Sequence, residues 1–178
     1  MKKLYVKLKR LKEDNKGVMA IEIVIGCFIF LMVMCLLMDL LVLSWKFSVI
    51  SQLNTKIARQ AGVQGGYLSS APTAYPGGDS AYTSISELNA MVTDHLKKAG
   101  IAEDEWSLKI DNRKVLGGGT LAPTAKIEYR ETLETELTIT YEWETLSNFL
   151  PGNLTNTLTS KRPSMSEWKY DYNIWDGE

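Results

Sequence analysis

The chain of 178 residues is poor in the residues that build disulfide and metal frameworks. It holds two cysteines, Cys27 and Cys35, and one histidine, His95. Both cysteines fall within a single apolar run, so no disulfide can brace the polar part of the chain. The His/Cys spacings of zinc sites are also missing. We therefore expect neither a metal nor a cofactor.

The sequence also lacks the signatures of common catalytic and nucleic-acid sites. It contains no HExxH motif and no nucleophile elbow, and the run at 117–119 is a triple glycine without the following Lys-Ser/Thr of a phosphate-binding loop. Glu136, Glu142 and Glu144 share one face of a predicted strand, which favours a solvated acidic face over a hydrolytic carboxylate pair. Basic residues are too scattered for a nucleic-acid surface. These absences predict a non-enzymatic protein.

Charge of one sign is concentrated at the start of the chain. The net charge is only -1, but residues 1–17 hold seven Lys or Arg against two acids. An apolar run follows at 18–45, in which Glu22 and Asp39 are the only ionisable residues. As a helix the run would rise about 42 Å, which exceeds a hydrocarbon core of about 30 Å. The basic flank predicts a single-pass membrane protein with a cytoplasmic N-terminus and an extracytoplasmic body.

The boundary between the basic and apolar stretches reads NKGVMAIE. Gly17 ends the charged stretch, Val18 opens the apolar run, and Glu22 is the fifth residue of that run. A secretory signal fits poorly, because its apolar region is usually about 7–15 residues and ends at a small-x-small site. The junction instead resembles the processing site of type IV prepilins. The resemblance lies in the order and spacing of five features: a basic leader, a glycine, an apolar residue, a glutamate and a long apolar helix.

Within that group the chain is similar to the TadE-like minor pilins, the pseudopilins of tight-adherence systems. Three regions carry this similarity. These proteins often have a second acid at the position of Asp39, and their continuation helix has the character of SQLNTKIARQAG. They end in a strand, a loop and a strand, which are similar to LTITYEW, LSNFLPG and LTNTLTS. The chain departs from them in having Asp39 instead of Glu and in its aromatic tail, WKYDYNIWDG.

The resemblance implies a processing and assembly scheme. A prepilin peptidase would cut after Gly17, so that residues 1–17 are the leader and Val18 is the new, methylated N-terminus. Glu22 would be the assembly carboxylate. The partners would be other pilin subunits, an inner-membrane assembly platform and the lipid bilayer. The subunit would be associated with the cell membrane or with a filament that serves adhesion or secretion.

The two acids of the apolar run leave alternatives open when taken by themselves. Glu22 is either solvated near the inner lipid headgroups or present because it binds a partner. The second alternative follows from the cost of inserting a carboxylate at mid-helix into a membrane, about 2.5–3.5 kcal/mol on insertion scales. Asp39 lies about 25 Å further along the helix, so the two cannot form one site in one helix. Asp39 is either solvated at the outer interface or a secondary contact in the membrane with a neighbouring subunit.

The rest of the chain predicts an α+β outer domain with a small antiparallel sheet. The transmembrane helix should continue to residue 61, ended by Gly62, Gly65 and Gly66, and 62–82 reads as a loop rich in Gly, Pro and Ser. The outer domain, 83–178, should open with a helix that Ser84 and Glu87 cap and whose apolar face includes His95. Period-two alternation predicts strands over 106–110, 125–129 and 137–144, and a fourth near 154–160.

Two functions from different classes fit this organisation. The first is a structural pilin-like subunit whose leader is removed. The second is a bitopic, membrane-anchored binding or sensor module that keeps its leader.

Overall fold

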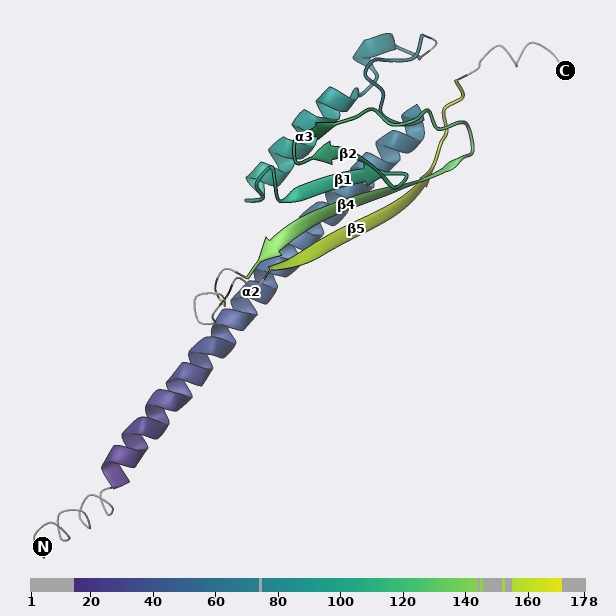
Figure 1. Cartoon of the computed structure of the whole chain (residues 1–178). Coiled ribbons are helices and arrows are strands. Elements are labelled where there is room, and N and C mark those ends of the chain that lie inside the picture. Colours follow the sequence, from purple (N-terminus) through teal and green to yellow (C-terminus); the bar gives the residue numbers. More distant parts are fainter. Residues whose placement is uncertain (1–14, 74, 144, 146–151, 153–154, 171–178) are drawn as a thin grey trace, which may run out of the picture. The chain divides into compact units, whose positions relative to one another are not determined.

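The computed structural model describes residues 15–73, 75–143, 145, 152 and 155–170. Its elements are α2 (Asn15–Gln64), η1 (Gly78–Ser80), α3 (Ile85–Lys98), β1 (Trp106–Ile110), β2 (Arg113–Gly117), β3 (Thr120–Leu121), β4 (Thr132–Glu142) and β5 (Thr155–Met165) (Figure 1). The chain forms two compact units: Met1–Leu41 with Trp143–Asn153, and Val42–Glu142 with Leu154–Glu178. Helix α2 contributes residues to both.

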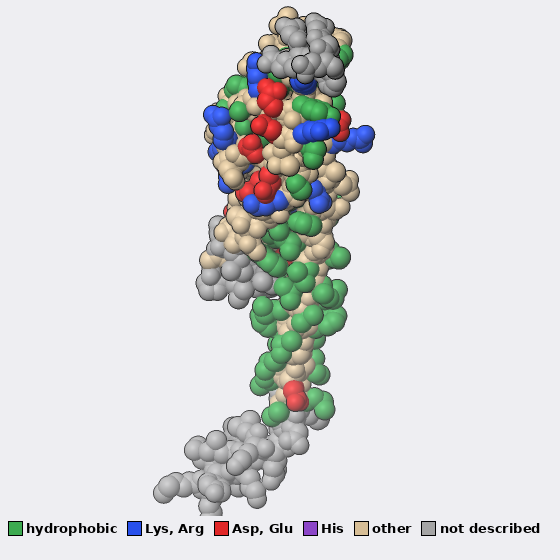
Figure 2. Space-filling model, turned by 90° about the vertical axis from the view of Figure 1, so that its right-hand side faces the viewer, with side chains coloured by type: hydrophobic (Ala, Val, Ile, Leu, Met, Phe, Trp, Pro, Cys, Tyr) green, Lys and Arg blue, Asp and Glu red, His purple; other side chains and the backbone are tan. Residues whose placement is uncertain are grey.

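In the first unit, α2 presents apolar side chains on all sides. The exposed fractions of Val18, Ile29 and Leu41 are 64%, 56% and 66%. Figure 2 shows hydrophobic side chains covering this part of the helix. The stretch Val18–Gln64 is long and apolar enough to cross a membrane, with a mean hydropathy of 2.8 in its most apolar window. Apolar residues on every face are what a lipid environment requires, whereas a surface helix of a soluble domain has one apolar stripe.

The second unit is built on one antiparallel sheet of five strands in the order β3-β2-β1-β4-β5. The longest pairing joins β4 and β5, from Thr132 opposite Met165 to Glu142 opposite Thr155. Strand β1 pairs with β4 in register from Trp106 opposite Ile139 to Ile110 opposite Thr135. The long apolar helix and the antiparallel sheet confirm the predicted α+β fold.

The sheet buries one face against the two helices. Alternate residues of β4 point inward, among them Leu133, Leu137 and Ile139, and β1 buries Trp106, Leu108 and Ile110. Helix α3 adds its own buried stripe to this core. From α2 come Ile50, Leu53, Ile57 and Ala61 at helical spacing. The amphipathic second part of α2 is therefore part of the core, as its periodicity predicts.

Of the three glycines predicted to end α2, two do so and one does not. The helix continues through Gly62 to Gln64, and Gly65 adopts a left-handed conformation with φ +70°. The Gly66 N–H then donates to Ala61 O at 2.9 Å, the bond that closes a Schellman motif. Gly65 and Gly66 thus end the helix as predicted. Gly62 does not end it. Its missing side chain instead leaves room for β5, since a Cβ there would lie 2.8 Å from Met165 O.

The capping prediction for α3 is confirmed. The Ser84 side chain accepts from the Glu87 N–H while the Glu87 side chain accepts from the Ser84 N–H. Residues Leu88, Val92 and Leu96 form its buried face. The placement of His95 on that face is wrong: the side chain is exposed, and Nδ1 lies 3.0 Å from Met91 O of the preceding turn.

The predicted strand over 125–129 is wrong. Its backbone bonds go to the loop that follows α2: the Thr124 N–H, just before the segment, donates to Tyr67 O, and the Ile127 N–H donates to Gly65 O. It therefore pairs with no strand of the sheet. Ile127 is buried while Tyr129 is 44% exposed, so the alternation in the sequence does not mark two faces.

Other strand predictions hold in part. Strand β4 contains most of the predicted 137–144 strand but begins at Thr132 and ends at Glu142. Strand β5 extends the fourth prediction to Met165, and Leu154 lies outside the described residues. The hairpin of β2 and β3 was not predicted. Gly117 ends β2, and the next two glycines form the turn between the two strands.

Candidate functional site

The predicted processing junction lies at the start of α2. The helix begins at Asn15, so Gly17 and Val18 fall in its first turn. A glycine within a helix costs roughly 0.5–1 kcal/mol relative to alanine, which makes this first turn easy to open. Residues 1–14, which contain most of the predicted leader, lie outside the described residues.

Glu22 lies on the exposed surface of the apolar part of α2. Within the part of the chain that the structure describes, its carboxylate makes no hydrogen bond and no ion pair. The surrounding side chains, Ile21, Ile23 and Val24, are 60–67% exposed and apolar. An isolated carboxylate on an apolar helix surface fits a residue that meets its partner outside this chain.

Asp39 is not the solvated residue of the first alternative that we predicted for it. Its side chain is 2% exposed, and its Oδ1 accepts a hydrogen bond of 3.2 Å from the Thr145 backbone N–H. Thr145 follows β4 and belongs to the same compact unit as Asp39. The carboxylate therefore lies buried within its own chain and is not solvated, while its contact with a neighbouring subunit stays a prediction. The two residues are 106 positions apart, so no local pattern could have indicated the contact.

The two predicted acids are thus not brought together. Both lie on α2, 17 positions apart, and each has its own surroundings. The structure gives them separate chemical possibilities: Glu22 can take a partner, whereas Asp39 holds the chain that leaves β4.

A polar contact that the sequence did not indicate joins α2 to the sheet. Asn54 is fully buried, and its Nδ2 donates to Ser160 O at 2.7 Å and to Thr135 O at 3.2 Å. These carbonyls belong to β5 and β4. The amide nitrogen thus has two partners on the sheet, which favours one rotation of α2 against it, whereas Oδ1 of the same side chain has no partner among the described residues.

The acids of the sheet's outer face are paired with lysines instead of forming a purely acidic surface. Glu136 lies 2.8 Å from Lys161 of β5 and 3.4 Å from Lys109 of β1. The hydrogen bond from Lys161 holds the pKa of Glu136 below its usual value. Glu142 is exposed, and Glu144 lies outside the described residues. Figure 2 shows acidic and basic side chains next to one another on the visible face of this unit.

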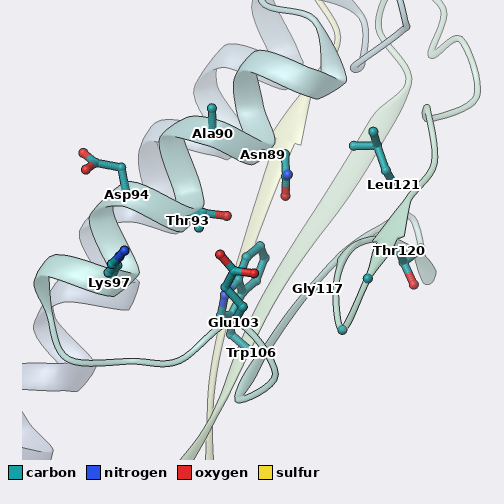
Figure 3. Close-up of a pocket in the computed structure, with 12 residues that line it drawn as sticks. Asn89, Ala90, Thr93, Asp94, Lys97, Glu103, Trp106, Gly117, Thr120 and Leu121 are labelled. Atoms are coloured by element: carbon teal, nitrogen blue, oxygen red, sulfur yellow. The ribbon is translucent and has the colours of Figure 1, made fainter.

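One hollow in the second unit lies between α3 and the β2–β3 hairpin (Figure 3). Its volume is about 420 Å³, within the range of about 300–1,000 Å³ typical of ligand sites. Asn89 and Thr93 line it from α3, Glu103 and Trp106 from β1 and the loop before it, and Leu121 from β3. We name it the α3–β3 groove. No group of three or more His, Cys, Asp or Glu suited to a metal occurs among the residues that the structure describes.

Comparison with known proteins identifies no relative of this chain. No protein-family model matches the chain, and no curated protein or solved structure matches it either. The functional argument therefore depends on the residues and geometry of this chain.

Proposed function

We propose that this chain is a pilin-like structural subunit, a minor pilin or pseudopilin of a type IV or tight-adherence pilus or a related secretion filament. One observation carries the proposal: Gly17, Val18 and Glu22 stand at prepilin spacing at the start of an exposed apolar helix. A prepilin peptidase would remove residues 1–17. The helix would then pack among like helices drawn from the membrane, with the sheet domain on the extracytoplasmic side.

Cleavage after Gly17 changes the electrostatics of the helix start. It creates a positive amine on Val18, at the end of the helix that already carries the positive end of its dipole. A carboxylate near that end is stabilising, and Glu22 is the fifth residue of the new chain. In a staggered bundle, the amine of one subunit can approach Glu22 of its neighbour.

The size of that attraction indicates what it can do. Two charges at about 4 Å attract by roughly 4 kcal/mol at an effective dielectric constant of about 20. Desolvation offsets much of this gain, while an unpaired partner remains costly. The contact therefore sets the register between subunits and adds little to the total binding free energy.

The test is the mass of the N-terminus in the native host. We expect the mature chain to begin at Val18 with a methylated amine, and Gly17→Trp to retain the full leader. Gly26→Ala is the matched control, because Gly26 lies in the same helix with nothing within 4 Å of its missing Cβ. An intact Met1 in wild-type membranes with an active prepilin peptidase would contradict the proposal.

A second candidate is favoured by one observation, the α3–β3 groove. A groove of this size would suit a membrane-anchored binding or sensor module. Such a module would keep residues 1–17, so the same mass measurement separates the two functions.

A further inference from the structure

Two exposed aromatic side chains lie close together in the middle of α2. Trp45 is 53% exposed and Phe47 is 47% exposed, while Lys46 between them is buried. Residues two positions apart on a helix lie about 200° from each other around its axis and differ in height by only about 3 Å. Trp45 and Phe47 therefore project from two different sides of α2 at nearly the same height.

The exposed surface of α2 changes from apolar to polar at this height. On the side towards Val18 the large exposed side chains are apolar, and Leu41 is 66% exposed. After Phe47 the exposed residues of the helix are polar as far as Gly62: Ser48, Gln52, Thr55, Lys56 and Arg59. A helix that leaves a bilayer changes in this way, and tryptophan is enriched at the boundary because its ring is apolar and its N–H is polar.

The buried residue between the two aromatic side chains joins α2 to the sheet. The Lys46 Nζ lies 5.2 Å from the centroid of the Tyr141 ring, which is a cation–π contact. Tyr141 is the last residue but one of β4 and pairs with Asn156 near the start of β5. Figure 1 shows these strand ends next to α2. This end of the sheet therefore lies close to the height of Trp45 and Phe47.

Asp39 supplies an independent observation. It lies six residues before Trp45 in the same continuous helix, about 9 Å along the helix axis. A carboxylate that far below a lipid headgroup layer is unfavourable unless it has a partner within the protein. The burial of Asp39 and its hydrogen bond from the Thr145 N–H meet that requirement.

We propose that Trp45 and Phe47 anchor the chain in a lipid headgroup layer, and that the adjoining ends of β4 and β5 rest on that layer. The inference depends on a membrane-spanning α2, which both candidate functions require, and it adds the position of the bilayer surface. Ile50, three positions or about 5 Å after Phe47, already belongs to the hydrophobic core of the sheet unit. No linker therefore separates this unit from the bilayer.

The charges at this end of the sheet indicate which lipids it meets. Glu142 is exposed, and so are Glu103 and Asp104 in the loop before β1. That loop is bonded to the end of β4, since the Thr140 N–H donates to Glu105 O at 2.7 Å. Anionic lipids attract lysine and arginine, so they repel these acids. The headgroup layer that fits this end of the sheet is zwitterionic.

Nitroxide labels along α2 locate the bilayer surface. Leu41, Ser48 and Gln52 are exposed, and each is changed to cysteine and labelled in a full chain whose two native cysteines are replaced by serine. In phosphatidylcholine vesicles, electron paramagnetic resonance measures the contact of each label with oxygen, which concentrates in lipid, and with a water-soluble nickel chelate. We expect oxygen contact to dominate at Leu41, about 6 Å below Trp45, and nickel contact at Gln52, about 10 Å above it.

Three results would contradict the expected profile in different ways. A Gln52 label in contact mainly with oxygen, or a Leu41 label in contact mainly with nickel, would place the surface elsewhere and overturn the proposal. A profile that changes with the protein-to-lipid ratio would assign the aromatic side chains to a second copy and also overturn it. A chain that does not float with the vesicles would contradict the membrane-spanning helix itself, and with it both candidate functions.

Removal of the two aromatic side chains tests their role as anchors. In the variant that combines Trp45→Ala with Phe47→Ala, the bilayer surface should shift towards Val42, the next large exposed apolar residue. We expect oxygen contact of the Ser48 label to fall roughly twofold. Val63→Ala is the matched control, because Val63 is an exposed apolar residue of α2 beyond the polar stretch, and it should leave the profile unchanged. The same profile in both variants would overturn the anchoring role.

Lipid composition tests the assignment of the headgroup. The Ser48 label is measured again in vesicles in which anionic phosphatidylglycerol replaces most of the phosphatidylcholine. We expect its oxygen contact to stay the same or to fall, because the acids at the end of the sheet are repelled. A rise in oxygen contact would mean that anionic lipids draw the chain towards the bilayer, and would overturn the assignment of a zwitterionic layer.

Discussion

The two parts of α2 differ in where their apolar side chains lie. In the first unit, Ile29 and Leu31 are each 56% exposed, whereas Ile50 and Ile57 in the second unit are completely buried. The first part is apolar on every face, and the second has an apolar stripe with polar residues elsewhere. One continuous helix is thus suited to two surroundings, lipid and a protein core, and the pattern of its residues decides which part meets which.

The acids of the first part show a second contrast. Glu22 is exposed without a described partner, while Asp39 is 2% exposed and bonded to Thr145. Residue type alone does not assign a role to either carboxylate. The comparison teaches that burial and a hydrogen bond inside the chain, and not residue type, separate the two carboxylates.

The largest expected effect concerns this contrast between the acids. Glu22→Ala should insert and lose its leader almost normally but fail to join the filament or its assembly complex, because the new Val18 amine loses its partner. Glu22→Asp should be partly impaired, and Asp39→Asn milder than Glu22→Ala, since an amide oxygen can still accept from Thr145. Co-purification with the other pilus subunits, with an immunoblot for leader removal, measures this. Normal assembly of Glu22→Ala would mean that Glu22 is only a solvated residue near the lipid headgroups and has no role in assembly.

The next effect compares burial in the two parts of α2. Ile57→Ala should lower the free energy of unfolding of the sheet unit by about 2–5 kcal/mol, because it leaves a cavity in a closed core. Ile29→Ala, at an exposed position of the first part, should leave that unfolding unchanged. Thermal unfolding of the solubilised full chain, followed by near-UV circular dichroism, gives both values. Similar losses for the two variants would remove the distinction between the two parts.

A smaller effect is expected at two glycines of the same helix. In Gly62→Ala the new methyl group would lie 2.8 Å from Met165 O, so β5 must shift, at a cost of about 1–3 kcal/mol. Gly26→Ala meets nothing within 4 Å and should be neutral or slightly stabilising, since alanine favours the helix. The melting temperatures of the two variants make the comparison. A stabilising Gly62→Ala would show that β5 does not need the close approach.

The smallest effect concerns the ion pairs of the outer sheet face. Lys161 holds the pKa of Glu136 below its usual value, so this pair contributes stability above the ordinary pKa of a glutamate. The contribution is lost as the pH falls through the lowered pKa, when Glu136 takes up a proton. We expect Lys161→Gln to lower the melting temperature slightly at pH 7, and by less as the pH falls below the ordinary pKa of a glutamate. A difference that does not shrink as the pH falls would point to packing of the lysine stem instead of charge.

Local patterns were enough to predict several elements. The capping box of α3 was predictable because Ser84 and Glu87 satisfy each other's backbone within four residues. The alternation in β1 and β4 was predictable because one face of a sheet is buried and the other is not. The apolar run predicted the helix, because a long uninterrupted run with apolar residues on every face is typical of a membrane-spanning helix. The prepilin spacing of Gly17, Val18 and Glu22 remains a prediction from sequence.

Contacts between distant residues decided the rest. The segment at 125–129 has the alternation of a strand. However, the Thr124 N–H before it donates to Tyr67 O and the Ile127 N–H within it donates to Gly65 O, so the segment is bonded to the loop after α2. Asp39 is buried, and Thr145, 106 positions away, donates a hydrogen bond to it. Gly62 lies within the helix, where its missing side chain leaves room for Met165 of β5. A sequence specifies local hydrogen bonds and the hydrophobic period, but which distant group satisfies a given N–H or carboxylate is settled only when the chain packs.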